Sequence, residues 1–242
     1  MGAQGRESYL LKGSSSIDQR EPYGEALATR LAARLMNPGE YVPYVLEFEG
    51  DTALSACKTM ATESVGFLSA NELVTWAGIS EGRDLLTNYL AALNRLQAPR
   101  TQELVSKMMV ADYVMANFDR HKGNFGIMRN SETLDDVRVA PVFDNGGGFF
   151  SRATVGELRH KAFAYQSNPF EVYPLVQVAR TPDLSWYDPE MLDGFPDEVK
   201  EVLSENELLT PEFVDLATKQ VKRHIEVVNE LAAERISLIS WS

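Results

Sequence analysis

The first sixty residues show two different hydrophobic spacings. Residues 8–13 hold enough β-formers for a short strand, and residues 41–50 and 52–60 could form an antiparallel pair across the turn between them. Residues 23–36 instead place apolar side chains four positions apart, which predicts a helix. Those apolar positions are Leu27, Leu31 and Leu35. The pattern therefore predicts the order strand, helix, strand, strand.

From about residue 70 the spacing becomes helical. Segments 69–78, 82–96 and 101–118 repeat apolar side chains at helical intervals, and each has a Ser, Gly or Thr near its start that can cap a helix. Two short apolar segments, 125–129 and 137–143, flank a polar turn. We expect these two segments to form a hairpin.

The C-terminal part of the chain mixes acidic and amphipathic stretches. Residues 181–215 are rich in Asp, Glu and Pro, which predicts a solvated acidic surface of short helices and loops. A long amphipathic helix is expected over residues 211–240. The whole predicts an α+β protein with a small β-rich N-terminal lobe, residues 1–62, and a larger helical lobe, residues 63–242. A cleft between two such lobes is a common ligand site.

Composition narrows the class of protein. The net charge of −12 and the pI of about 4.8 argue against broad nucleic-acid binding, which needs cationic surface. Cys57 is the single cysteine, so an intrachain disulfide and a thiolate zinc site are both excluded. The first thirteen residues lack the apolar run of a signal peptide, and no stretch approaches the ~20 apolar residues that cross a bilayer. We expect a bacterial cytoplasmic protein without membrane or direct nucleic-acid partners.

Candidate chemistry begins at the segment "DRHKGNFG", between the third predicted helix and the hairpin. Asp119 and Asn124 have the five-residue separation of the catalytic carboxylate and the metal-binding amide in kinases. The hairpin returns the chain to Asp144 in "PVFDNGG", so a second carboxylate can lie beside Asn124. Phosphoryl transfer needs little more than such positioned charges. Lys12 at a strand end and Glu25 on the next helix would complete the set.

These stretches resemble a known family. "ANFDRHKGNFGI" and "VAPVFDNGG" are similar to the HipA-like serine/threonine kinases, whose loop reads D-x-H-x-x-N and whose metal-binding Asp follows P-x-x-D. The D-R-H-x-x-N order also resembles phosphatidylinositol-3-kinase-type enzymes. "YLLKGSSSIDQREPYGEALATRLAARL" resembles the lysine strand and helix of the compact CtkA-like members. The resemblance covers residues 8–150 and implies a two-lobed protein-kinase-like fold that uses ATP and Mg²⁺.

The resemblance also implies roles for single residues. Asp119 would be the catalytic base, and His121 a catalytic-loop residue near the phosphate. Asn124 and Asp144 would be the Mg²⁺ ligands. The implied nucleotide-binding groups are Lys12 for the phosphates, Glu25 as its ion-pair partner, and for adenine the backbone of residues 58–63, including Met60 and Glu63.

The phosphate-binding end of the N-terminal lobe leaves alternatives open. Only eleven residues precede Lys12, too few for a glycine-rich loop with two strands, although "MGAQG" resembles a remnant of the HipA phosphate loop. Part of the lobe would then be missing from this chain or supplied by another polypeptide. Alternatively the lobe is minimal, and "GSSS" (13–16) holds the phosphates through backbone N–H groups and hydroxyls. Ser14 would then bind nucleotide, and Ser14, Ser15 and Ser16 are candidates for autophosphorylation.

Three functional hypotheses follow. The first is an ATP- and Mg²⁺-dependent serine/threonine kinase with a protein substrate and, by resemblance to HipA-like toxins, an antitoxin as candidate partner. The second keeps the chemistry but makes the acceptor a lipid or a small molecule. The third is a nucleotide-binding pseudokinase that regulates a partner. Asp119, Asn124 and Asp144 together argue against the third, because a binding module needs no base.

Overall fold

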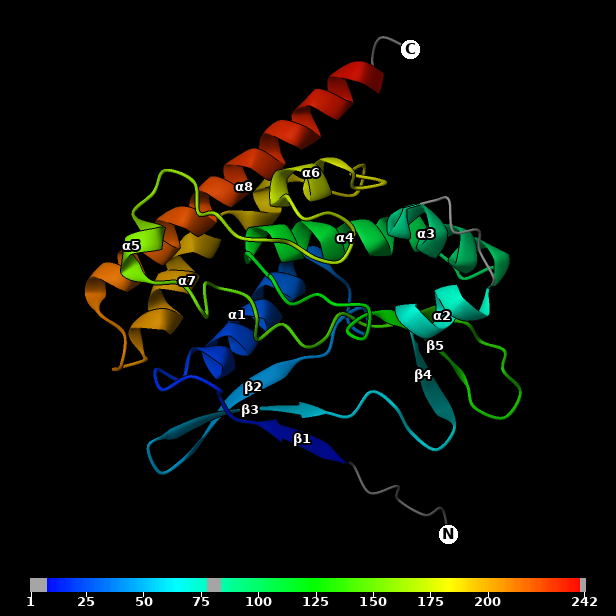
Figure 1. The fold of residues 1–242 in the computed structure, drawn as a ribbon, viewed down its shortest axis with the longest axis horizontal. Helices are drawn as coiled ribbons and strands as arrows, with labels where there is room; N and C mark the ends of the chain where they lie inside the picture. The colour runs from blue at the N-terminus through cyan, green and yellow to red at the C-terminus, as the bar shows by residue number, and fades with distance from the viewer. Residues whose placement is uncertain (1–7, 78–83, 240–242) are drawn as a thin grey trace.

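A three-stranded antiparallel sheet forms one end of the molecule (Figure 1). The structure, a computed structural model, describes residues 8–77 and 84–239. The sheet has the order β1–β3–β2, and its strands match the three predicted in the first sixty residues, each slightly shorter than expected. They are β1 (Tyr9–Lys12), β2 (Tyr44–Glu49) and β3 (Thr52–Lys58).

Strand register decides which way Lys12 points. Lys12 lies opposite Ser55 of β3, and Ser55 lies opposite Leu46 of β2. Residues directly opposite each other in antiparallel strands share a face of the sheet, so the side chains of Lys12, Ser55 and Leu46 lie on the same face. The helix α1 (Arg20–Leu35) packs against β2 and β3 (Figure 1). It begins three residues before the predicted helix and carries Glu25.

A second small sheet has the order β4–β5–β6. β5 (Gly126–Asn130) and β6 (Arg138–Val139) form the predicted hairpin, although β6 is only two residues long. β4 (Val65–Ser69) was not predicted, and it pairs with β5 along its whole length. A Cβ on Gly126 would lie 2.1 Å from the Leu68 carbonyl oxygen, so only glycine permits this pairing. The predicted lobe boundary at residues 62 and 63 stays a prediction.

The three predicted central helices are present. They are α2 (Ala70–Trp76), α3 (Leu85–Arg95) and α4 (Thr101–Val114). The expected continuation of α4 to residue 118 is wrong, because Ala116 has a φ of 53° and a right-handed helix cannot pass through it. The predicted helical residues 78 and 82–83, and "MGAQG" at the N-terminus, lie outside the described residues.

The remaining helices lie around α1 and α4, and the C-terminal end of the last one lies far from the first sheet (Figure 1). The predicted long C-terminal helix is present as α8, which packs on α4, α5 and α7. The acidic segment holds the expected short helices, η1 and α7, whereas α5 and α6 were not individually predicted. Their bounds are α5 (Val155–Leu158), α6 (Pro174–Ala179), the 3₁₀ helix η1 (Pro189–Leu192), α7 (Phe195–Ser204) and α8 (Pro211–Ile239).

The core is centred on α4. Every residue from Val105 to Val114 is buried, including Lys107 and Asp112. A helix buried on all sides is held by the elements around it rather than by one amphipathic face. Its C-terminal end leads directly into the segment with the candidate catalytic residues. None of the helices in the described part of the chain combines the length and the apolar character that crossing a bilayer requires.

Candidate active site

A cleft of about 270 Å³ brings together four of the predicted site residues. They come from β1, from α1, from the loop after α4 and from the loop after β6. These four residues are Lys12, Glu25, Asp119 and Asp144. The cleft is also lined by Gly13, Glu21, Ser55, Gly146 and Gly147. Lys12 and Asp144, which are 132 positions apart in the sequence, therefore share one cavity.

Lys12 lies between two carboxylates. Its Nζ donates a hydrogen bond to Asp144 and lies 3.6 Å from Oε1 of Glu25. Burial alone would lower the pKa of Lys12, but the hydrogen bond to Asp144 and the charge of Glu25 outweigh it and raise this pKa above its usual value. The ammonium group therefore stays charged and is held facing the cleft.

Glu25 is almost completely buried, with 2% of its surface exposed. Oε2 accepts a hydrogen bond of 2.9 Å from the backbone N–H of Asn145, whereas Oε1 has no hydrogen-bond donor among the described residues. Burial raises the pKa of Glu25, and the nearby Lys12 ammonium opposes this shift. Because a buried carboxylate is costly without a counter-charge, Glu25 and Lys12 fix each other's position.

Asp119 presents an exposed carboxylate from a tightly held backbone. Its N–H donates to Oδ1 of Asn117 at 3.0 Å, and its carbonyl accepts from Nδ2 of Asn124 at 3.2 Å. A Cβ on Gly147 would lie 2.7 Å from Cβ of Asp119, so glycine is required where the loop after β6 crosses this residue. The carboxylate itself makes none of these contacts and is available to a substrate.

Asn124 and Asp144 offer oxygen ligands of the type that Mg²⁺ takes. The amide nitrogen of Asn124 is engaged by Asp119, which leaves its amide oxygen for a ligand. Asp144 has a φ of 56°, a conformation that Asp tolerates, and its N–H donates to the Tyr44 hydroxyl at 3.3 Å. Among the described residues, no group of three or more His, Cys, Asp or Glu could hold a metal. One carboxylate and one amide fit a Mg²⁺ that also binds substrate phosphates.

The other predicted site residues, like Asn124, are not among the residues that line the cleft. His121 is exposed, and its Nδ1 accepts a hydrogen bond from Gly123. Ser14 lies next to Gly13, with its hydroxyl 3.0 Å from that of Ser16. Met60 packs with Phe143 against Val42, Tyr44 and Cys57, and Glu63 is exposed in the segment before β4. Their predicted contacts with phosphate and adenine stay predictions.

Arg120 is a functional candidate that the sequence reasoning missed. It is fully buried and makes a two-pronged ion pair with Asp112, with Nε–Oδ2 and Nη2–Oδ1 distances of 3.0 and 2.9 Å. Its Nη1 also donates to the carbonyls of Asn124, at 3.1 Å, and of Phe143. One guanidinium group therefore ties the loop of Asn124 to the residue that precedes Asp144.

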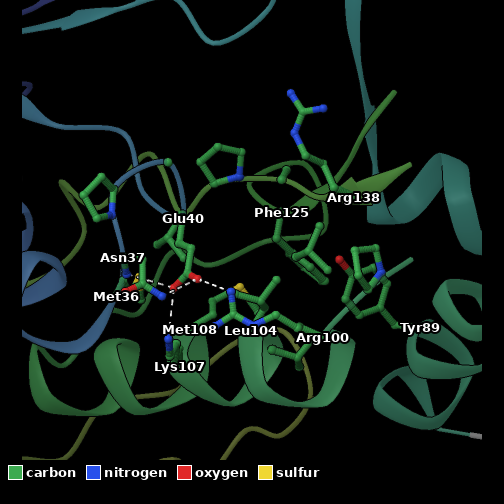
Figure 2. A pocket seen from close by; sticks show the side chains of 18 residues that line it. Met36, Asn37, Glu40, Tyr89, Arg100, Leu104, Lys107, Met108, Phe125 and Arg138 are labelled. Atoms are coloured by element: carbon green, nitrogen blue, oxygen red, sulfur yellow. Dashed lines mark hydrogen bonds and ion pairs between the residues drawn. The ribbon is translucent and has the colours of Figure 1, made fainter. Parts of the chain in front are cut away.

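A second pocket, of about 340 Å³, lies between α4 and the loop that joins α1 to β2 (Figure 2). Predominantly apolar side chains line it, and it includes none of the predicted site residues. Glu40 projects into it and accepts hydrogen bonds from Lys107 at 3.0 Å and from Arg100 at 2.6 Å (Figure 2). These charged groups bond to one another, so they form an ion-pair network that stabilises the structure beside the core.

We expect acid to weaken the fold through Glu40. Burial alone would raise the pKa of Glu40, but hydrogen bonds from Asn37, Lys107 and Arg100 outweigh it and lower the pKa to about 2 from 4.5. A lowered folded-state pKa contributes stability above pH 4.5 that is lost as the pH falls towards 2. The full shift corresponds to at most about 3 kcal/mol of the unfolding free energy, and solvent screening of the exposed Arg100 reduces this contribution.

The measurement is urea unfolding of wild type and Glu40→Gln. The variant should be less stable by about 1–3 kcal/mol near pH 7, and the gap should narrow near pH 3. Glu132→Gln, at an exposed position in the turn after β5, is the control and should leave both values unchanged. An equal gap at the two pH values would contradict the assignment.

Comparison with known proteins identifies one relative by sequence. No protein-family model matches the chain. The serine/threonine-protein kinase CtkA of Helicobacter pylori (strain J99 / ATCC 700824) is 33% identical over 104 residues, which covers 40% of this chain. The match spans only 32% of that relative's own length. The chain is thus homologous to CtkA over part of both sequences.

Solved structures extend the likeness to the whole fold. The crystal structure of a proinflammatory kinase CtkA from Helicobacter pylori gives a TM-score of 0.68 at 16% identity, covering 98% of this chain and 93% of that chain. HipA of Shewanella oneidensis MR-1, solved in a complex with HipB and operator DNA, gives 0.53 at 14% identity, covering 93% and 59%. The predicted α+β, kinase-like fold is confirmed. The likeness to phosphatidylinositol-3-kinase-type enzymes stays a prediction.

Proposed function

We propose that this kinase-like protein is an ATP- and Mg²⁺-dependent serine/threonine protein kinase of the bacterial cytoplasm. The observation that carries the proposal is the cleft itself. Lys12 is paired with the buried Glu25 and contacts Asp144, the candidate Mg²⁺ ligand. The carboxylate of Asp119 lies in the same cavity. Phosphoryl transfer depends on positioned charges of this kind. The homology to CtkA supports the same reaction class.

Each group would have a separate task. Asp119 would accept the proton of the attacking hydroxyl, because its carboxylate is exposed while its backbone is fixed. Lys12 would bind the phosphates, held in place by Glu25. Asn124 and Asp144 would hold Mg²⁺, which supplies charge neutralisation at the phosphate oxygens. The Lys12–Asp144 contact would then loosen, since both groups gain ligands of opposite charge.

Nucleotide recognition at the edges of the cleft is part of the proposal. Ser15 donates to Glu21 through its N–H and its hydroxyl, at 2.5 and 2.7 Å, which holds the "GSSS" turn beside Gly13. We expect Ser14 to reach the phosphates from this turn. Backbone groups around Met60 and Glu63 would contact adenine. An antitoxin partner remains part of the same proposal, because HipA was solved with HipB and operator DNA as a toxin–antitoxin system.

Binding of MgATP is expected to stabilise the wild-type protein in a thermal-shift experiment. ATP at about 100 times its dissociation constant should add about 2.7 kcal/mol, or roughly 5–10 °C for a chain of this size. Asp144→Asn should lose the Mg²⁺-dependent part of the shift, because an amide is a weaker Mg²⁺ ligand than a carboxylate. Lys12→Met should lose the larger share, because the phosphates lose their cation.

Asp136→Asn is the matched control. Asp136 is an exposed aspartate with a φ of 51°, so the substitution is the same in the same backbone conformation but lies in the turn between β5 and β6. It should retain the full MgATP shift. A wild-type protein that shows no shift and transfers no labelled phosphate from ATP to any protein would refute the proposed function.

A further inference from the structure

Asp119 lines a second hollow on the side facing α5, in addition to the cleft. This hollow has a volume of about 500 Å³ and is open to solvent. Phe118, Phe150, Phe163 and Tyr165 form most of its aromatic wall. A group lying in the hollow is therefore adjacent to the carboxylate that we assign as the base.

Arg152 lies at this hollow, and its guanidinium is 4.7 Å from the ring centroid of Phe118. The side chain is exposed, and no carboxylate in the described part of the chain lies within ion-pair distance of it. Glu157, the other charged residue there besides Asp119, uses Oε2 to accept two hydrogen bonds of 2.8 Å from Thr154. Arg152 is thus the cation that remains available to a ligand.

Two residues of the aromatic wall also line another hollow of about 500 Å³. Phe163 and Tyr165 line both hollows, and their rings stack with centroids 5.7 Å apart. Leu175 of α6 lines this other hollow, which does not include Asp119, and is 55% exposed. The cations Lys161 and Arg223 are matched there by Glu226 and Glu230, so this part carries no net charge, and Leu175 with the two aromatic rings supplies apolar surface. Because the two hollows share Phe163 and Tyr165, we refer to them together as the groove, and Asp119 lines its first part.

We propose that this groove is the acceptor site and selects an extended Ser/Thr peptide with an acidic side chain beside the acceptor residue and a large apolar side chain further along. Arg152 would pair with the acidic side chain, and Leu175 with Tyr165 would receive the apolar one. The inference rests on the proposed kinase function. An extended peptide fits because two adjoining open hollows share an aromatic wall, and one offers Arg152 whereas the other offers the exposed Leu175. A compact small molecule would occupy only one of them.

The test is phosphorylation of a peptide library with Ser or Thr at the centre and varied flanking residues. Wild type should prefer Asp or Glu at one position next to the acceptor, by about tenfold in kcat/KM over Lys. Arg152→Glu should reverse this preference, whereas Arg152→Lys, which keeps the positive charge, should retain it. Leu175→Asp should reduce the apolar preference and leave the acidic one, because Leu175 lies in the other hollow. Salt should weaken only the charge preference.

Each outcome separates the inference from the proposed function. If the library is phosphorylated without an acidic preference that depends on Arg152, the acceptor-site inference is wrong and the kinase assignment stands. An equal loss of kcat for all peptides in Arg152→Glu would show that Arg152 acts on the phosphoryl group instead, and would also overturn the inference. If wild type neither binds MgATP nor transfers phosphate, the proposed function itself is wrong.

Discussion

Replacing Asp119 with asparagine is expected to lower phosphoryl transfer by about 10²- to 10⁴-fold, the usual contribution of a general base. Asparagine has the same size but cannot take the proton of the acceptor hydroxyl. The loop should keep its shape, because Asn117 and Asn124 bind the backbone N–H and carbonyl of Asp119 and not its carboxylate. MgATP binding should therefore be almost unchanged. The measurement is transfer of labelled phosphate beside the thermal shift with MgATP.

Lys122→Gln is the control for this substitution. Lys122 is exposed in the same loop and does not line the cleft, so its loss should leave the rate within about twofold. Two results would contradict the prediction. Transfer by Asp119→Asn within tenfold of wild type would show that another group takes the proton. Loss of the MgATP shift together with activity would mean that the substitution disturbed the loop.

The sequence contained much of the local information about this cleft. Helical and strand spacings predicted the strand that ends at Lys12 and the helix that carries Glu25. The fixed separation of Asp119 and Asn124, followed by a hairpin, indicated that Asp144 would return to them. These predictions depend on periodicity and short spacings, which a single sequence records. The roles of the residues stay predictions, whereas their common location in one cleft is now a structural fact for four of them.

Contacts between residues far apart in the chain were harder to predict from the sequence than local structure. β4 pairs with β5 across about sixty residues, and "VGFLS" alone is too short to indicate a partner. Helix α4 was extended too far because its apolar spacing continues past Val114, and only the conformation of Ala116 ends it. Asp112 did leave a local sign, since a carboxylate interrupts the apolar run "MMVADYVM". A buried acid requires a buried partner, and in the structure that partner is Arg120.

Asp112 and Arg120 account for the shape of the site rather than its chemistry. Asp112 accepts from Nδ2 of Asn117 at 2.9 Å as well as from Arg120. Asn117 in turn holds the backbone of Asp119. Arg120 donates to the carbonyls of Asn124 and of Phe143, the residue before Asp144. The carboxylate of Asp112 therefore connects Asp119 to the loops of Asn124 and Asp144 through a chain of buried and partly buried hydrogen bonds.

Removing the Arg120 charge is thus expected to have the largest effect on stability of any substitution near the site. Arg120→Met leaves the Asp112 carboxylate, 2% exposed, without its counter-charge. Breaking a buried pair in this way costs about 3–5 kcal/mol, or roughly 6–20 °C in Tm for a chain of this size. The matched control is Arg138→Met, whose ion pair with Asp136 is exposed and should contribute at most about 1 kcal/mol. Thermal or urea unfolding measures both.

The double variant Arg120→Met with Asp112→Leu tests whether the Asp112–Arg120 pair serves folding alone or also positions the residues of the site. Removing both charges should recover much of the lost stability, because no uncompensated charge stays buried. Activity should not recover with it, since the carbonyls of Asn124 and Phe143 lose their shared donor and Asn117 loses its acceptor. The apparent affinity for Mg²⁺ should fall as well, because the two ligand-bearing loops are no longer tied together. A stable double variant with wild-type activity and Mg²⁺ affinity would show that the pair serves folding alone.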